Sequence, residues 1–173
     1  MLLVTHLGCW SVWCRASPDG SAFKYKDVQE LHQMENYTMN EMDFWNRHSV
    51  QYLEMAFETG HKEVLHHPDG YGRRVGDCGD IVSFFVKVSD HRLSQISFTT
   101  QGCLNTTACC NTVVALARGK TLDQAWEITP EHVKDYLKTL PEDHEHCAEL
   151  AVGGFYLALS DYQAKWKKRE QTV

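Results

Sequence analysis

The sequence predicts an α+β fold in which a small antiparallel sheet carries helices packed on one of its faces. One observation is a pair of strand patterns. Residues 81–88 are β-branched and aromatic, and residues 93–100 alternate apolar with polar side chains. The other observation is the helical spacing of apolar residues on both sides of this pair, most clearly in 103–118. An apolar sheet face and the apolar stripes of helices are buried most simply against each other.

The segment before the strands is expected to hold one helix and a loop. Apolar residues recur at helical spacing through 42–59, and Gly60 supplies a C-terminal stop. Residues 61–79 contain Pro68 and four glycines, which predict a loop that leads into the first strand. The two strands then form a hairpin that turns at 89–92.

Three further helices are expected after 103–118. A capping-box signature at 121–124 predicts a short helix, and the Thr-Pro pair at 129–130 is typical of another helix start. The last helix is long, with acidic residues at 142–143 and basic residues at 165–169, an order that the helix dipole favours. Two adjacent glycines in its middle indicate either close packing or a break.

The length and composition suit one domain with a tail, since 43% of the 173 residues are hydrophobic. Residues 1–38 keep no sustained period, so we expect a poorly ordered tail, with the folded domain in 39–173. The net charge of −6 disfavours a nucleic-acid partner. The sequence has no apolar run of the roughly 20 residues that a membrane helix needs, and its N-terminus lacks a secretory pattern. The protein is therefore expected in the cytoplasm, without a membrane partner.

The cysteines indicate the chemistry. Seven is an odd count, which excludes a fully paired disulfide framework and makes reduced thiols the expectation. Cys78, Cys103 and Cys147 all fall where a predicted strand or helix begins or ends. Such positions favour thiolates, because free backbone N–H groups and the helix dipole lower a thiol pKa. Gly79 and Gly102 beside them allow unusual backbone angles and close approach to a bulky ligand.

A fourth ligand could come from either of two residues. Asp80 lies two positions after Cys78, and His146 directly precedes Cys147. Three soft thiolates favour zinc, copper(I) or an iron-sulfur cluster. An oxygen or nitrogen in the fourth position would leave the metal open to exchange, whereas a closed set of four thiolates would retain it. The sequence thus predicts an exchange site.

The other cysteines and the loop histidines are interpreted without a metal role. Cys110 lies two helical turns after Cys103, about 10 Å along the axis, which is too far to share one metal ion. It and its neighbour are expected in the core. Those set aside are Cys9, Cys14, Cys109, Cys110, His61, His66 and His67.

Several segments that carry these residues resemble the IscU and NifU-type iron-sulfur cluster assembly scaffolds. They occur in the same order as in that family and extend roughly over 77–162. The segments are Cys78–Ile81, Gln101–Cys103, Ala115–Ala125, and His146–Cys147 followed by Leu150–Ala151.

The resemblance implies an α+β scaffold protein rather than an enzyme. In that family a cysteine desulfurase delivers sulfur, iron arrives separately, and a transient [2Fe-2S] cluster is built and passed to acceptor proteins. Carried over by motif, Cys78, Cys103 and Cys147 would ligate the cluster and accept sulfur. Asp80 would keep the cluster labile, and His146 would be the alternative fourth ligand. Such sites commonly take zinc without iron. The resemblance leaves a homodimer open.

Two segments depart from the family pattern. Residues 140–144 read Leu-Pro-Glu-Asp-His where IscU scaffolds carry the Leu-Pro-Pro-Val-Lys segment that an Hsp70-type chaperone reads, so the resemblance does not extend to that partner. Residues 66–69 replace an Asn-Pro-Arg type of sequence, so docking to the desulfurase could differ.

Two other functions remain open at this point. One is a zinc-dependent sulfur acceptor of the SufU type, which would stimulate a desulfurase. SufU-type chains carry an insertion between the second and third cysteines and lack the histidine found here as His146. The other is a structural zinc domain, although structural zinc prefers a closed set of Cys and His ligands.

Overall fold

The computed structural model describes residues 43–171. The predicted tail at 1–38, with Cys9 and Cys14, lies outside the described residues. The elements are α2 (Val50–Phe57), β1 (Gly70–Val75), β2 (Ile81–Ser89), β3 (Arg92–Gln101), α3 (Leu104–Ala117), α4 (Leu122–Trp126), α5 (Pro130–Leu137), the 3₁₀ helix η1 (Glu142–His144) and α6 (His146–Glu170).

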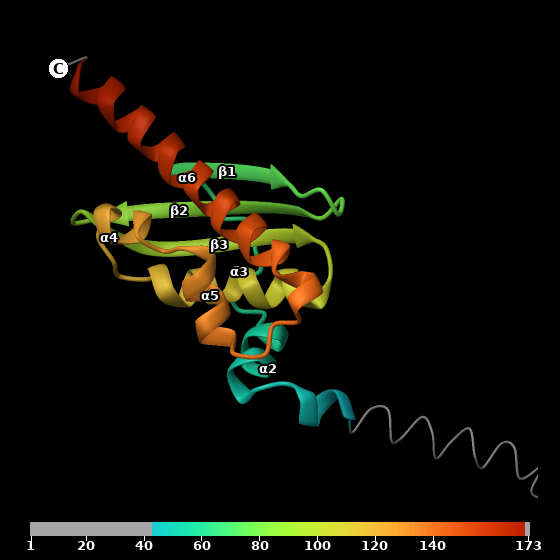
Figure 1. The fold of residues 1–173 in the computed structure, drawn as a ribbon. Helices are drawn as coiled ribbons and strands as arrows, with labels where there is room; N and C mark the ends of the chain where they lie inside the picture. Colours follow the sequence, from blue (N-terminus) through green and yellow to red (C-terminus); the bar gives the residue numbers. More distant parts are fainter. Residues whose placement is uncertain (1–42, 172–173) are drawn as a thin grey trace, which may run out of the picture. The chain divides into compact units, whose positions relative to one another are not determined.

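The sheet has three antiparallel strands in the order β1-β2-β3. α6 packs across β1 and β2, α3 packs beside β3, and the two helices also contact each other (Figure 1). Phe84 of β2 lies at the centre of the core, with its ring 5.8 Å from those of Phe98 and Phe155. The predicted α+β class, with helices packed on a small antiparallel sheet, is confirmed.

The prediction of a loop through 61–79 is wrong for β1. This strand pairs with β2 in a regular register, with Gly72 opposite Phe84. Gly70 and Gly72 are buried, and a Cβ atom on either would collide with the backbone of α6 at Ala158. The glycines are therefore explained by a helix that passes directly over the strand. They also remove the β-branched pattern that would have revealed the strand in the sequence.

The predicted helix over 42–59 is interrupted. Residues 43–47 are helical, and α2 starts anew after Ser49. The Ser49 hydroxyl accepts a hydrogen bond from the Tyr52 amide at 3.0 Å and donates one to the Leu137 carbonyl at 2.6 Å. Serine forms such bonds more readily than it continues a helix. The break therefore fastens α2 to the end of α5.

The other helix starts follow the sequence. The capping boxes Thr121–Gln124 and Thr129–His132 are both formed, with Pro130 at the start of α5. α6 continues through its two glycines, so close packing is the reason for them. A Cβ atom on Gly154 would lie 2.6 Å from a methyl carbon of Val82. In the described part of the chain, none of the helices has the length and apolar character required to cross a membrane.

Candidate metal centre

One end of the sheet brings the predicted site residues together. The register sets Val75 opposite Ile81, and Ile81 opposite Gln101. The turn after β1, which carries Cys78, therefore lies at the same end as Cys103, which follows β3. The first turns of α6 lie here too, because Gly76 in that turn packs against the side chain of Leu150.

Cys103 is the N-cap residue of α3, and its thiol is exposed. The hydroxyl of Thr106, one turn into the helix, lies 3.4 Å from the Cys103 sulfur and 3.4 Å from the Cys147 sulfur. Thr106 is fully buried. Its hydroxyl oxygen therefore connects an exposed thiol with a buried one.

Asp80 is held beside this pair. Its carboxylate accepts a hydrogen bond from the Thr106 hydroxyl at 2.5 Å and one from the Cys103 amide at 3.2 Å. Gly102 makes this approach possible, because a Cβ atom there would lie 2.5 Å from the same carboxylate oxygen. Gly79 takes a positive φ of 86° in the preceding turn, a conformation that glycine adopts without strain.

The expectation that all three thiols have a lowered pKa is wrong for Cys147. This residue lies in the first turn of α6 with 0% of its surface exposed. Burial raises the pKa of its thiol to about 12, although the Thr106 hydroxyl beside it works in the opposite direction. The loss of solvation outweighs the favourable end of the helix. At neutral pH this thiol is protonated unless a cation compensates its charge.

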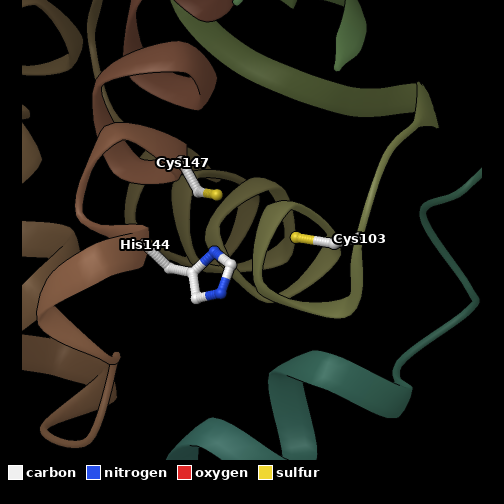
Figure 2. A group of neighbouring side chains, drawn as sticks. All are labelled: Cys103, His144 and Cys147. Atoms are coloured by element: carbon white, nitrogen blue, oxygen red, sulfur yellow. The ribbon is translucent and has the colours of Figure 1, made fainter. Parts of the chain in front are cut away.

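Cys103 and Cys147 form a group with a histidine that the sequence reasoning did not select. The ligand atoms of Cys103, His144 and Cys147 all lie within 4.8 Å of one another. Figure 2 shows the imidazole ring of His144 beside the two sulfur atoms, with one ring nitrogen turned toward them. Among the described residues this is the only such group of potential ligands.

The remaining predicted residues, Cys78 and His146, line one cavity. His146 is exposed, and its Nε2 atom lies 3.6 Å from the Cys147 sulfur. With the exposed Cys78 it lines an open cavity of about 360 Å³, which Arg74 and Glu149 also line. The five predicted residues thus fall into two halves that meet at Cys147.

The donor set suits zinc or iron. Two sulfurs and an imidazole are ligands that both metals accept, and a site with three protein ligands keeps a position open. His144 Nδ1 is buried and has no hydrogen-bond partner within the described residues. A buried nitrogen without a partner is costly, and a metal ion would satisfy it.

Cys109 and Cys110 are core residues, as predicted. Both are fully buried in α3, and burial raises the pKa of each thiol well above its ordinary value. All five cysteines in 43–171 are free thiols.

The histidine that was missed has a weak signal in the sequence. Residues 144–147 read His-Glu-His-Cys, and the pattern favours the second histidine because it directly precedes Cys147. The difference comes from η1, which ends at His144 before α6 begins. A turn of 3₁₀ helix of this kind is not encoded in any apolar periodicity.

Comparison with known proteins identifies the family. Residues 61–169 match the model of the NifU-like N terminal domain. The chain belongs to this family. Among curated NifU-like relatives, iron-sulfur cluster assembly scaffold protein IscU 1 of Archaeoglobus fulgidus is 37% identical over 99 residues, covering 56% of this chain and 64% of that protein. The corresponding IscU of Escherichia coli is 33% identical over 89 residues, covering 51% and 69%.

Solved structures agree on the NifU-like fold. The N-terminal part of a NifU-like protein from Brucella abortus superposes with a TM-score of 0.57 at 15% identity, covering 68% of this chain and 94% of that one. A putative SUF-system scaffold protein from Fervidobacterium islandicum gives a TM-score of 0.55 at 14% identity, covering 65% and 96%. At such identities the likeness concerns the fold alone. The chain spans less than two thirds of the length of the Archaeoglobus relative.

Proposed function

We propose that this protein is a scaffold on which a transient [2Fe-2S] cluster is built and from which it is passed to acceptor proteins. The observation that carries the proposal is the gathering of Cys78, Cys103 and Cys147 at one end of the sheet, with Asp80 beside two of them. Relatives of the chain are named as scaffold proteins for cluster assembly.

The three thiols have different tasks in this proposal. Cys78 and Cys103 are exposed, so a cysteine desulfurase can deliver sulfur to them directly. Cys147 is buried and ligates the metal from the protein interior. Iron and sulfur are the substrates, and the completed cluster is the product that leaves.

Asp80 and His146 supply the weak side of the site. Asp80 accepts hydrogen bonds from Thr106 and from the Cys103 amide on one carboxylate oxygen, Oδ2, so the other oxygen is left to ligate iron. A carboxylate held in this way is easily displaced from a metal, because its hydrogen bonds remain after it leaves. His146 lies 3.6 Å from the Cys147 sulfur and can ligate from the exposed side.

Anaerobic reconstitution with iron, sulfide and a desulfurase tests the proposal. The wild-type protein should develop the visible absorbance of a [2Fe-2S] cluster, and Cys103→Ser should lose it. Cys110→Ala is the matched control, since this core thiol should be dispensable for the chromophore. If no chromophore forms in any variant, the proposal fails.

A zinc-dependent sulfur acceptor of the SufU type is the second candidate. The observation that favours it is the Cys103, His144 and Cys147 group, which offers zinc three ligands without a cluster. To separate the two functions, the zinc-loaded protein is added to the desulfurase, and both desulfurase turnover and cluster absorbance are measured. Strong stimulation of desulfurase turnover without cluster formation would favour the sulfur acceptor.

A further inference from the structure

β1 forms one edge of the sheet, and within residues 43–171 it pairs only with β2 (Figure 1). In the same register, the Gly76 amide donates to the Asp80 carbonyl at 2.8 Å. Backbone groups alternate in direction along an antiparallel strand, so every second residue before Gly76 also bonds to β2. The N–H and C=O groups of Tyr71, Arg73 and Val75 therefore point away from the sheet.

This edge is blocked at one end only. The Tyr71 amide donates to the Asp161 carboxylate of α6 at 2.9 Å. In the part of the chain that the structure describes, the backbone N–H and C=O of Arg73 have no hydrogen-bond partner. Arg73 and Val75 are both exposed. Exposed backbone groups of this kind are a template on which another strand can pair.

α6 forms a wall beside the open edge. Leu157 precedes Asp161 by four residues, so both lie on the side of the helix that faces the edge. The helix backbone at Leu157 passes directly over Gly72, where an added Cβ atom would lie 2.7 Å from its carbonyl carbon. Leu157 is 45% exposed, and Tyr71, on the opposite face of the sheet, is 41% exposed. A strand added to the edge would therefore find an apolar contact on each of its faces.

Both charged side chains of β1 are arginines. Arg73 lies on the open face of the sheet, and Arg74 lies on the helix face, where its guanidinium donates to the Glu149 carbonyl at 3.3 Å. Within the described residues neither arginine forms a salt bridge. Asp161 of the wall is already paired with Lys165 at 2.7 Å. The edge therefore presents one guanidinium without a carboxylate partner on each face.

These charges decide which occupant fits the edge. A second copy of this chain, paired through the same edge, would bring four arginines close together, and like charges across a strand pair are destabilising. An acidic segment instead places a carboxylate opposite each arginine, an arrangement that stabilises a strand pair. The edge thus favours an acidic partner over a second copy.

We propose that the edge of β1 binds an extended acidic segment of a partner protein as an added antiparallel strand, the more stable direction of pairing. Adjacent carboxylates of the segment lie opposite Arg73 and Arg74, with apolar side chains beside them against Leu157 and Tyr71. The strand continues into the turn that carries Cys78, so the bound segment reaches the cavity that this thiol lines. Binding at the edge does not depend on the proposed function.

Nuclear magnetic resonance titration of the isotope-labelled whole chain with the acetylated and amidated peptide Ser-Val-Asp-Glu-Val-Phe-Ser tests the inference. In the proposed register its Asp lies opposite Arg74 and its Glu opposite Arg73. The amide resonances of Arg73 and Val75 should shift and saturate at millimolar peptide. A peptide with Lys-Lys in place of Asp-Glu should bind about tenfold more weakly. Absence of shifts at these two amides, or equal binding of both peptides, would overturn the inference.

Backbone pairing is tested on the peptide, where the change cannot affect folding of the protein. In an antiparallel pair the residue opposite Arg73 directs its N–H toward β1, and the next residue directs its N–H away. N-methylation of the peptide Glu should therefore weaken binding at least about fivefold, the effect of a lost hydrogen bond. N-methylation of the peptide Asp is the matched control and should leave the affinity within about twofold. Equal effects of the two methyl groups would contradict an added strand.

Arg73→Pro and Arg73→Ala give the same test on the protein. Both remove the charge, but only proline removes the outward N–H, which takes no part in the pairing with β2. The proline variant should bind the unmethylated peptide at least about fivefold more weakly than the alanine variant. Equal affinities in two folded variants would mean that the peptide contacts side chains only, and strand addition would be wrong.

Two further measurements separate this inference from its alternatives. If the same amides shift with protein concentration in the absence of peptide, the edge binds a second copy and the inference fails. Cluster reconstitution in Arg73→Ala should be normal, since this arginine does not line the cavity with Cys78. Peptide binding without cluster formation in the wild type would remove the proposed function and leave the docking edge.

Discussion

The three thiols at the sheet end differ most in solvation. Cys78 and Cys103 are exposed, whereas Cys147 is fully buried beneath the Thr106 hydroxyl. Burial raises the pKa of Cys147 to about 12, and the neighbouring Cys103 and Asp80 raise it further by their negative charge. A metal ion must therefore displace a tightly held proton from Cys147, while it meets the other two thiols at the surface.

Alkylation measures this difference. In metal-free protein treated with iodoacetamide at pH 8, Cys78 and Cys103 should be labelled first, and Cys109, Cys110 and Cys147 should be protected. At that pH a thiol with a pKa near 12 is only about one ten-thousandth thiolate, the reactive form. As long as the pH is below the pKa, raising the pH by one unit increases the thiolate fraction about tenfold. Peptide mass spectrometry over time gives the rates, and equal rates for Cys103 and Cys147 would contradict this description.

Residue types alone predicted which cysteines lie in the core and which lie at element ends. They did not predict the histidine beside Cys103, because the choice between His144 and His146 depends on the single turn of η1. They also gave the wrong direction for the pKa of Cys147, since burial is a property of the packed helix and not of its sequence.

Among the helices and strands, β1 is the one whose secondary structure is hardest to predict from its own sequence. Helix caps are local, and those at Thr121 and Thr129 followed from residues within one turn. The glycines of β1 are instead required by α6, which is distant in the sequence and packs on the strand. A contact between residues so distant in the sequence leaves no periodic pattern in the strand itself, so the sequence of this segment is typical of a loop.

Gly72→Ala tests this explanation of β1. The added methyl group would meet the α6 backbone at Ala158 and Gly154, so strand and helix must separate. Overpacking of this kind costs about 1–3 kcal/mol of unfolding free energy. Urea unfolding followed by circular dichroism gives the value.

Gly60→Ala is the control for that substitution. There the nearest atoms to an added Cβ belong to the flexible side chain of Glu58. Its stability should change by no more than about 0.5 kcal/mol, as at an ordinary surface position. Equal effects at the two glycines would show that close packing against α6 is not the reason for Gly72.

At the scale of the whole molecule, the site exists because four parts of the fold meet at one place. The β1–β2 turn, the end of β3, the start of α3 and the start of α6 all lie at one end of the sheet. The buried core fixes the sheet and both helices, so the thiols are held at spacings that no local segment could maintain. The thiols of Cys78, in the β1–β2 turn, and Cys103, at the start of α3, remain accessible to partner proteins.

In the proposed function, we expect the charge around the site to favour release of the cluster. Asp80 lies beside two thiols and raises the pKa of Cys147, which means that its carboxylate disfavours negative charge there. A cluster ligated by thiolates is also negative, so Asp80 should destabilise it. Replacement of this carboxylate by alanine should therefore prolong the life of the cluster.

Transfer of a reconstituted cluster to an apo-ferredoxin tests the scaffold function most directly. Under anaerobic conditions the wild-type protein should lose its visible absorbance as the ferredoxin gains its own, and Asp80→Ala should form the same cluster but release it more slowly. Circular dichroism in the visible range distinguishes donor from acceptor. A cluster that never forms, or one that both variants retain equally in the presence of the acceptor, would contradict the proposed function.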